Sequence, residues 1–152
     1  MGTKKLISIL LAALAVFLLL TGCSGKNAAE FRTEDGIDLD LTKLSGTMVY
    51  AEVFNMRYEP DDYYGKVIRM EGYFSAYQNP NTGEYYYNCV VPDATACCSQ
   101  GIQFFLRDDL SYPEDFPENG ATVTVVGTFE KNDQNLYMCS LADCTMELAA
   151  EE

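Results

Sequence analysis

Cysteine is the residue type with the widest chemical reach in this sequence, because the 152-residue chain holds six cysteines and no histidine. The lack of histidine excludes a Ser-His-Asp or Cys-His relay, a His-ligated metal and an imidazole proton shuttle. Thiols can still bind soft metals, exchange electrons or pair as disulfides. No nucleophile stands beside a recognisable base, so we expect a protein that is not an enzyme.

Cys89, Cys97 and Cys98 are the candidate metal or redox residues. Their thiolates come close if the loop after Cys89 folds back over the preceding strand, and Asp93 could add an oxygen. Zinc accepts such sulfur and oxygen ligands tetrahedrally. However, adjacent cysteines do not form a C-x-x-C knuckle, and their thiols converge only on an irregular backbone. We therefore expect structural cysteines, as disulfides or buried thiols, and no cofactor. A site for zinc or another thiolate-bound metal, or thiol redox chemistry, is the alternative.

Cys23 lies apart from the other cysteines, in the N-terminal segment. The other five cysteines all follow residue 88, and an odd number of cysteines cannot all be paired in disulfides within one molecule. Adjacent Cα atoms lie ~3.8 Å apart, below the usual ~4.4–6.8 Å, so a Cys97–Cys98 bond would be strained. Cys139 and Cys144 face opposite sides of a regular strand, unless the strand bulges between them. Exported thiols are usually paired. Two schemes stay open: Cys89 with Cys97 or Cys98, or the same loop with Cys139 or Cys144.

The N-terminus has the three parts of a secretory signal. Two lysines precede an apolar run over residues 6–20, which would span about 22 Å as a helix, short of a ~30 Å hydrocarbon core. The next residues complete the segment Leu20-Thr21-Gly22-Cys23, which resembles the lipobox of bacterial lipoproteins. The resemblance implies cleavage between Gly22 and Cys23. It also implies a diacylglyceryl group, with acyl chains such as palmitate, on the Cys23 thiol.

The same resemblance implies a signal peptide (residues 1–22), a lipidated tether (23–36) and a folded domain (37–150). Two acyl chains give a stable anchor, so we expect the domain at the extracytoplasmic face of the cell membrane. The whole chain has a net charge of −13, and loss of the signal leaves 8 of its 10 basic side chains against 23 acidic ones, or −15. Anionic lipid repels such a domain, so the lipid must hold it there. Few cations remain to bind phosphate, and we expect no nucleic acid partner.

The apolar pattern predicts one helix followed by five strands. Val49, Val53 and Met56 repeat at helical spacing, and Pro60 ends the pattern. The predicted helix covers residues 47–58, and the strands cover 67–78, 84–91, 102–106, 121–130 and 136–146. Glycines inside the first and fourth strands mark the sharp bends of a closing barrel. The expected fold is all-β with one N-terminal helix, as a small five-stranded Greek-key barrel of the OB type.

Two segments resemble the first and fourth strands of OB-like bacterial lipoproteins. They are residues 64–72 (Tyr-Gly-Lys-Val-Ile-Arg-Met-Glu-Gly) and 121–129 (Ala-Thr-Val-Thr-Val-Val-Gly-Thr-Phe). The region 44–148 is similar to uncharacterised lipoproteins of Gram-positive-type bacteria, which share the Asp-Ala-Thr-Ala-Cys-Cys segment found here at residues 93–98. The resemblance implies an OB-like barrel and brings no activity with it.

Tyrosines gather on the first predicted hairpin, whose loop we place at residues 79–83. Directly opposed residues share a face of the sheet. The expected pairs are Tyr77 with Tyr85, Ser75 with Tyr87 and Tyr73 with Cys89. This pairing puts four candidate ligand-binding residues outside the barrel: Tyr73, Tyr77, Tyr85 and Tyr87.

OB-folds often bind ligands on this part of the sheet. Tyrosine offers both an apolar ring and a hydroxyl, which suits a sugar, a peptide or a protein. We therefore expect a binding module for an envelope protein, a peptide or a small ligand. The alternatives are that the tyrosines only pack beneath the helix or cover the sheet, and that the lipoprotein handles metal or redox chemistry through its cysteines.

Overall fold

The computed structural model describes residues 35–133 and 138–149, in which the predicted helix and all five predicted strands appear. The elements are β1 (Leu39–Asp40), η1 (Leu41–Lys43), α2 (Gly46–Tyr58), η2 (Pro60–Asp62), β2 (Val67–Gln78), β3 (Tyr85–Pro92), β4 (Ser99–Leu106), β5 (Thr122–Lys131) and β6 (Cys139–Leu148). The predicted signal peptide and Cys23 lie outside the described residues. Within the described ranges, no helix combines the length and the apolar composition needed to cross a bilayer.

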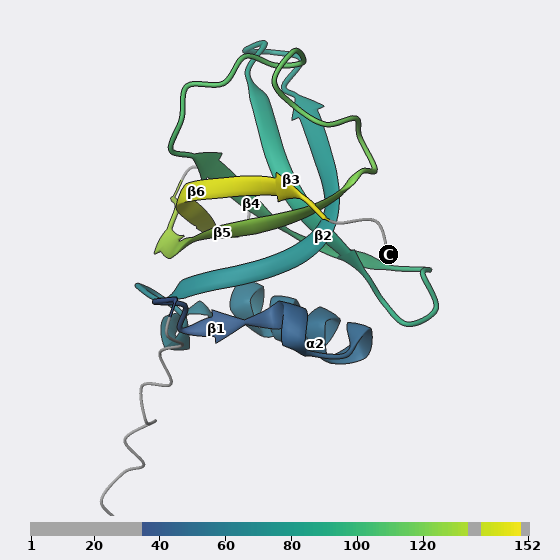
Figure 1. The fold of residues 1–152 in the computed structure, drawn as a ribbon, viewed down its shortest axis with the longest axis vertical. Coiled ribbons are helices and arrows are strands. Elements are labelled where there is room, and N and C mark those ends of the chain that lie inside the picture. The colour runs from purple at the N-terminus through teal and green to yellow at the C-terminus, as the bar shows by residue number, and fades with distance from the viewer. Residues whose placement is uncertain (1–34, 134–137, 150–152) are drawn as a thin grey trace, which may run out of the picture. The chain divides into compact units, whose positions relative to one another are not determined.

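Five of the strands close into a barrel. Their order is β2-β3-β4-β6-β5, and β5 returns to pair with β2. The β4–β6 pair is parallel, and the other pairs around the barrel are antiparallel. The short β1 adds to β2 in parallel at Ile68 and Arg69. The described residues thus confirm the predicted all-β, OB-like barrel with a single α-helix (Figure 1).

Alternate residues of the strands fill the barrel. On β5, Val123, Val125, Gly127 and Phe129 are buried, whereas the residues that alternate with them are at least partly exposed. Helix α2 lies across one end of the barrel (Figure 1) and adds Val53 and Met56 to the same core. Full burial of one such side chain contributes about 1.5–3 kcal/mol. The apolar residues that repeat at helical spacing in the sequence therefore form the face of α2 that covers this end of the barrel.

Strand β2 exchanges one partner for another where it passes Gly72. Residues up to Tyr73 pair with β5, and residues from Tyr73 onward pair with β3. The backbones approach so closely that a Cβ on Gly72 would lie 2.6 Å from the Val90 carbonyl oxygen and 2.9 Å from Cys89 Sγ. No side chain fits there, and this agrees with the bend predicted from a glycine inside a strand.

Strand β6 bulges near its middle, and the bulge turns both of its cysteines inward. Its pairing with β5 shifts register between Val126 and Thr128, and Asp143 takes a positive φ of 52°. Cys139 is consequently only 2% exposed and Cys144 only 1%. The opposite orientations expected for a regular strand are absent, because an extra residue on one strand reverses the alternation beyond it.

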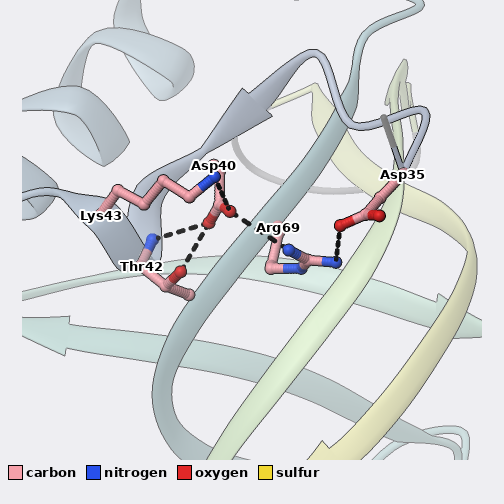
Figure 2. A network of polar contacts seen from close by, with 5 residues as sticks. All are labelled: Asp35, Asp40, Thr42, Lys43 and Arg69. Carbon is pink, nitrogen blue, oxygen red and sulfur yellow. Dashed lines mark hydrogen bonds and ion pairs between the residues drawn. The ribbon is translucent and has the colours of Figure 1, made fainter. Parts of the chain in front are cut away.

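A buried carboxylate fastens the N-terminal segment to the barrel (Figure 2). The Asp40 side chain is 5% exposed and accepts hydrogen bonds from the Thr42 backbone N–H at 3.2 Å and from its hydroxyl at 2.6 Å. Arg69 of β2 lies 3.2 Å from the other carboxylate oxygen, and Lys43 lies 3.3 Å from it. Arg69 also reaches Asp35 at 3.6 Å. Burial alone would raise the pKa of Asp40, but the hydrogen bonds and the Arg69 charge lower this pKa below its ordinary value.

Replacing Gly72 with alanine should destabilise the fold by roughly 1–3 kcal/mol, the usual cost of overpacking. Gly46→Ala is the matched control, because nothing lies within 4 Å of its added Cβ and alanine favours the first turn of α2. Urea unfolding followed by circular dichroism measures both variants. Equal urea midpoints for Gly72→Ala and wild type would contradict this prediction, because they would show that β3 can move away from residue 72 without loss of stability.

Acid should unfold the protein partly through Asp40. A carboxyl with a lowered pKa in the folded state adds stability above its unfolded pKa of ~3.9, and this stability is lost as the pH falls through the folded pKa. We therefore expect Asp40→Asn to lower Tm at neutral pH, and expect its difference from wild type to narrow below pH ~4. Thermal unfolding from pH ~7 to ~2 measures this. Asp109→Asn, at an exposed loop position, is the control, and a pH-independent difference for Asp40→Asn would contradict the assignment.

Candidate binding face and thiol cluster

The first hairpin pairs one residue out of the predicted register, since Tyr77 faces Tyr86 rather than Tyr85. The turn is one residue longer than predicted, because Glu84 belongs to it and donates its backbone N–H to the Thr82 hydroxyl at 3.3 Å. A slip of one residue turns every β3 side chain to the other face of the sheet. The prediction that four tyrosines share one outer surface was therefore wrong. Two faces divide them: Tyr73 and Tyr77 on one, Tyr85 and Tyr87 on the other.

Tyr85 and Tyr87 face the interior side of the hairpin, where the connection between β4 and β5 covers them. Tyr87 stacks on Phe116 with ring centroids 4.3 Å apart, and Tyr85 meets Tyr112 at 4.4 Å. Burial raises the pKa of Tyr87, whereas Tyr85 remains 38% exposed at the rim. Tyr87 is thus a residue of the core edge rather than of a ligand surface.

Tyr77, Tyr86 and Phe105 form an aromatic row across the outer face of β2, β3 and β4. Tyr77 pairs with Tyr86, and Phe105 comes beside Tyr86 because the preceding pair joins Tyr87 to Phe104. Tyr77 is 57% exposed, Phe105 is 46% exposed and Tyr86 is half-buried. The outer face of the barrel therefore carries three neighbouring rings that are available to a ligand.

The adjacent row on the same face is polar and uncharged. Ser75 pairs with Asn88, and Asn88 pairs in turn with Gln103. All three side chains are partly exposed. Tyr73, which is 47% exposed, follows in the row beyond. A hydroxyl and two amides thus border the aromatic row.

A recess of about 380 Å³ opens beside the aromatic row, between the β2–β3 turn and the β5–β6 turn. Its lining residues are Glu84, Tyr85, Tyr86, Gln103, Phe105 and Asn132. OB-folds bind oligonucleotides and oligosaccharides at this place, on the face of the second and third barrel strands and the two turns beside it.

Tyr86 and Phe105 are not among the site residues predicted from the sequence. Alternation within the predicted strand 102–106 was a usable signal for Phe105, because it places Phe105 on the face of the sheet opposite to that of Ile102. The position of Tyr86 depended on the length of the turn, which the run of turn-forming residues did not fix.

Cys89 lies apart from the exposed cysteine pair. Its side chain is fully buried beside Gly72, and burial raises the pKa of its thiol to about 12. Cys97 and Cys98 are exposed in the loop that joins β3 to β4. The structure therefore does not bring Cys89 to the predicted metal site. No disulfide joins the cysteines of the described ranges, and Cys89 cannot reach the pair because it points into the barrel.

Asp93, Cys97 and Cys98 come together instead, and we call them the Asp-Cys-Cys cluster. Their carboxylate and thiol atoms all lie within 4.8 Å of one another. The two Sγ atoms are 3.7 Å apart, and Cys97 Sγ is 3.3 Å from Asp93 Oδ2. Ala96 has a positive φ of 54° immediately before the pair. This is the irregular backbone that converging adjacent thiols require.

Hydrogen bonds within the loop hold the Asp93 carboxylate in place. Asp93 Oδ1 accepts from the backbone N–H of Thr95 at 3.1 Å and of Cys97 at 3.0 Å. Desolvation opposes the effect, but hydrogen bonds from Cys97, Cys98 and Thr95 lower the pKa of Asp93. The hydrogen bond and charge of the Cys97 thiol raise the pKa of Cys98. The cluster is thus held by the protein itself.

A cleft of about 570 Å³ lies between the N-terminal segment and the barrel. Its walls come from η1, the first turns of α2, β2 and the end of β3. Asp93 and Tyr73 are among its lining residues, together with the apolar Leu41, Leu44 and Val49. The cleft therefore adjoins the cluster through Asp93.

No protein-family model matches this chain. No curated protein matches it either. The similar solved structures include the following two. Asparaginyl-tRNA synthetase from Pyrococcus horikoshii, complexed with asparaginyl-adenylate, is 14% identical with a TM-score of 0.38, over 57% of this chain and 20% of that one. A candidate nucleic acid-binding lipoprotein from Klebsiella pneumoniae subsp. pneumoniae is 18% identical with a TM-score of 0.40, over 62% of this chain and 80% of that one.

The chain spans one fifth of the synthetase, and similarity of this size does not show what the chain binds. The names of both proteins nevertheless associate them with nucleic acid, and this contradicts the prediction that nucleic acid is not a partner. That prediction rested on the few cations beside the tyrosines, on an extracytoplasmic location and on net charge, which is a sum over the whole chain. Aromatic platforms can bind bases on one face of a protein through stacking, so a whole-chain charge does not decide the matter.

Proposed function

We propose that this chain is a lipid-anchored, extracytoplasmic binding module that takes an uncharged oligosaccharide on the outer face of its barrel. The observation that carries the proposal is the aromatic row, three neighbouring rings on β2, β3 and β4 beside a recess of about 380 Å³. Because nothing in the sequence pairs a nucleophile with a base, the proposed role is binding without catalysis.

The chemistry of the face favours a sugar. Aromatic rings offer flat apolar surfaces with a polar handle on tyrosine, which suit the C–H faces of a pyranose. The side chains of Ser75, Asn88 and Gln103 supply donors and acceptors for hydroxyls along the same face. Among the described residues, those that line the recess include one acid, Glu84, and no lysine or arginine. A phosphate backbone gains most of its affinity from such cations, so we commit to an oligosaccharide and treat an oligonucleotide as an outcome of the test.

The anchor part of the proposal rests on the lipobox-like segment that ends at Cys23. Two acyl chains on this thiol would hold a domain of charge −15 against the repulsion of anionic lipid. We expect Cys23→Ser to lose the lipid mass and to leave the membrane fraction, as measured by intact mass spectrometry and fractionation. Cys97→Ser is the matched control and should stay in the membrane fraction. Retention of Cys23→Ser there would contradict the anchor.

Removing one ring of the aromatic row should weaken oligosaccharide binding. We expect Tyr77→Ala and Phe105→Ala each to lower affinity roughly fivefold, because one stacked ring contributes on the order of 1 kcal/mol. Tyr58→Ala is the matched control, since Tyr58 is 59% exposed on α2, away from this face. The full chain is screened on an array of uncharged oligosaccharides, and the best ligand is then titrated by calorimetry.

A single-stranded oligonucleotide forms the second arm of the same experiment. Saccharide binding that falls in the two row variants and not in Tyr58→Ala supports the proposal. Equal affinities in all three variants would place the ligand elsewhere. Oligonucleotide binding that depends on the row, without saccharide binding, would replace the proposed ligand class.

A further inference from the structure

We propose that the Asp-Cys-Cys cluster binds a zinc-class divalent cation, with the thiolates of Cys97 and Cys98 and the carboxylate of Asp93 as its ligands. The cluster lies in the β3–β4 loop, after Pro92, whereas the aromatic row meets β3 at Tyr86. Six residues of strand separate these positions, or roughly 20 Å at ~3.3 Å per residue. The two sites are therefore independent.

The distances within the cluster fit tetrahedral coordination. Two thiolates at ~2.3 Å from zinc lie ~3.8 Å apart when the angle is tetrahedral, and a thiolate and a carboxylate oxygen lie ~3.6 Å apart. The Sγ atoms of Cys97 and Cys98 are 3.7 Å apart, and Cys97 Sγ is 3.3 Å from Asp93 Oδ2. The ligand atoms thus already stand within a few tenths of an ångström of two edges of the tetrahedron.

The loop holds this arrangement through a network around the ligands. The Asp93 backbone N–H donates to the Cys98 carbonyl at 2.8 Å and closes the loop. The Thr95 hydroxyl lies 3.2 Å from the Asp93 carboxylate and 3.1 Å from Cys97 Sγ. Partners of this kind orient metal ligands and raise affinity. The loop and its ligand side chains therefore need little further ordering when a cation binds.

The donor set selects the class of metal. Two soft sulfur ligands favour zinc over magnesium or calcium, which prefer oxygen. Cys97 and Cys98 are exposed, whereas Cys89, Cys139 and Cys144 are buried in the barrel. A cation can thus reach only this thiol pair among the described cysteines. Three protein ligands leave one tetrahedral position open, and Asp93 places the cluster at the edge of the cleft of about 570 Å³.

Zinc titration of the full chain, with Cys97 and Cys98 reduced and verified by mass spectrometry, tests the site. We expect one zinc per chain by calorimetry and elemental analysis. Cobalt in place of zinc should give the charge-transfer absorption of bound thiolates. The Cys97→Ser, Cys98→Ser double variant should lose the metal. Asp93→Asn should weaken binding by more than about tenfold, since even second-sphere partners contribute that much. Asp109→Asn, another exposed acid, should bind as wild type does.

Three results would overturn the site. The first is wild-type protein that takes up no zinc while both thiols are reduced. The second is zinc retained at full stoichiometry by the folded double variant, which would place the metal elsewhere. The third is calcium binding that matches zinc binding in affinity, which would show that the thiolates are not ligands. Circular dichroism confirms that each variant is folded.

Discussion

The barrel depends on one steric constraint, the close approach of β3 to Gly72 of β2. A single strand has to pair with β5 along its first half and with β3 along its second half. This exchange is possible only where the crossing backbone meets no side chain, and a Cβ at Gly72 would stand 2.6 Å from the Val90 carbonyl oxygen. From this point β2 and β3 run on together as the sheet that carries Tyr77 and Tyr86. The proposed binding face thus begins where the barrel closes.

Local patterns in the sequence were enough to predict the elements and much of the core. Val53 and Met56 at helical spacing, and the alternating valines of β5, report burial directly because their periods match those of a helix and a strand. Register is different, since it depends on the exact length of a turn. Glu84 lies in the turn, where its backbone N–H donates to the Thr82 hydroxyl, and this one additional turn residue reverses both faces of β3. The bulge at Asp143 is likewise set by tertiary packing rather than by the local pattern.

The candidate thiol site was likewise predicted only in part, because some of its features depend on local sequence and others on strand register. The requirement of an irregular backbone at Cys97 and Cys98 follows from covalent geometry, and the structure meets it with the positive φ of Ala96. Asp93 is close to the pair because only a short loop separates them, so its role was accessible from the sequence. Cys89 belongs to β3, and alternation on the corrected register turns it inward. Local chemistry was therefore predictable, whereas the direction in which the β3 side chains face was not.

The width of the aromatic row limits what can occupy it. Neighbouring strands lie ~4.8 Å apart, so rings on three adjacent strands span roughly 10 Å from first to last. A molecule the size of one sugar ring covers about one of these positions and leaves the other two in water. A chain of two or three linked sugar rings contacts all three aromatic positions at once. Each contact after the first then costs little additional translational freedom of the ligand. If the proposed oligosaccharide binds here, the face discriminates by the length of its ligand before it discriminates by the pattern of its hydroxyls.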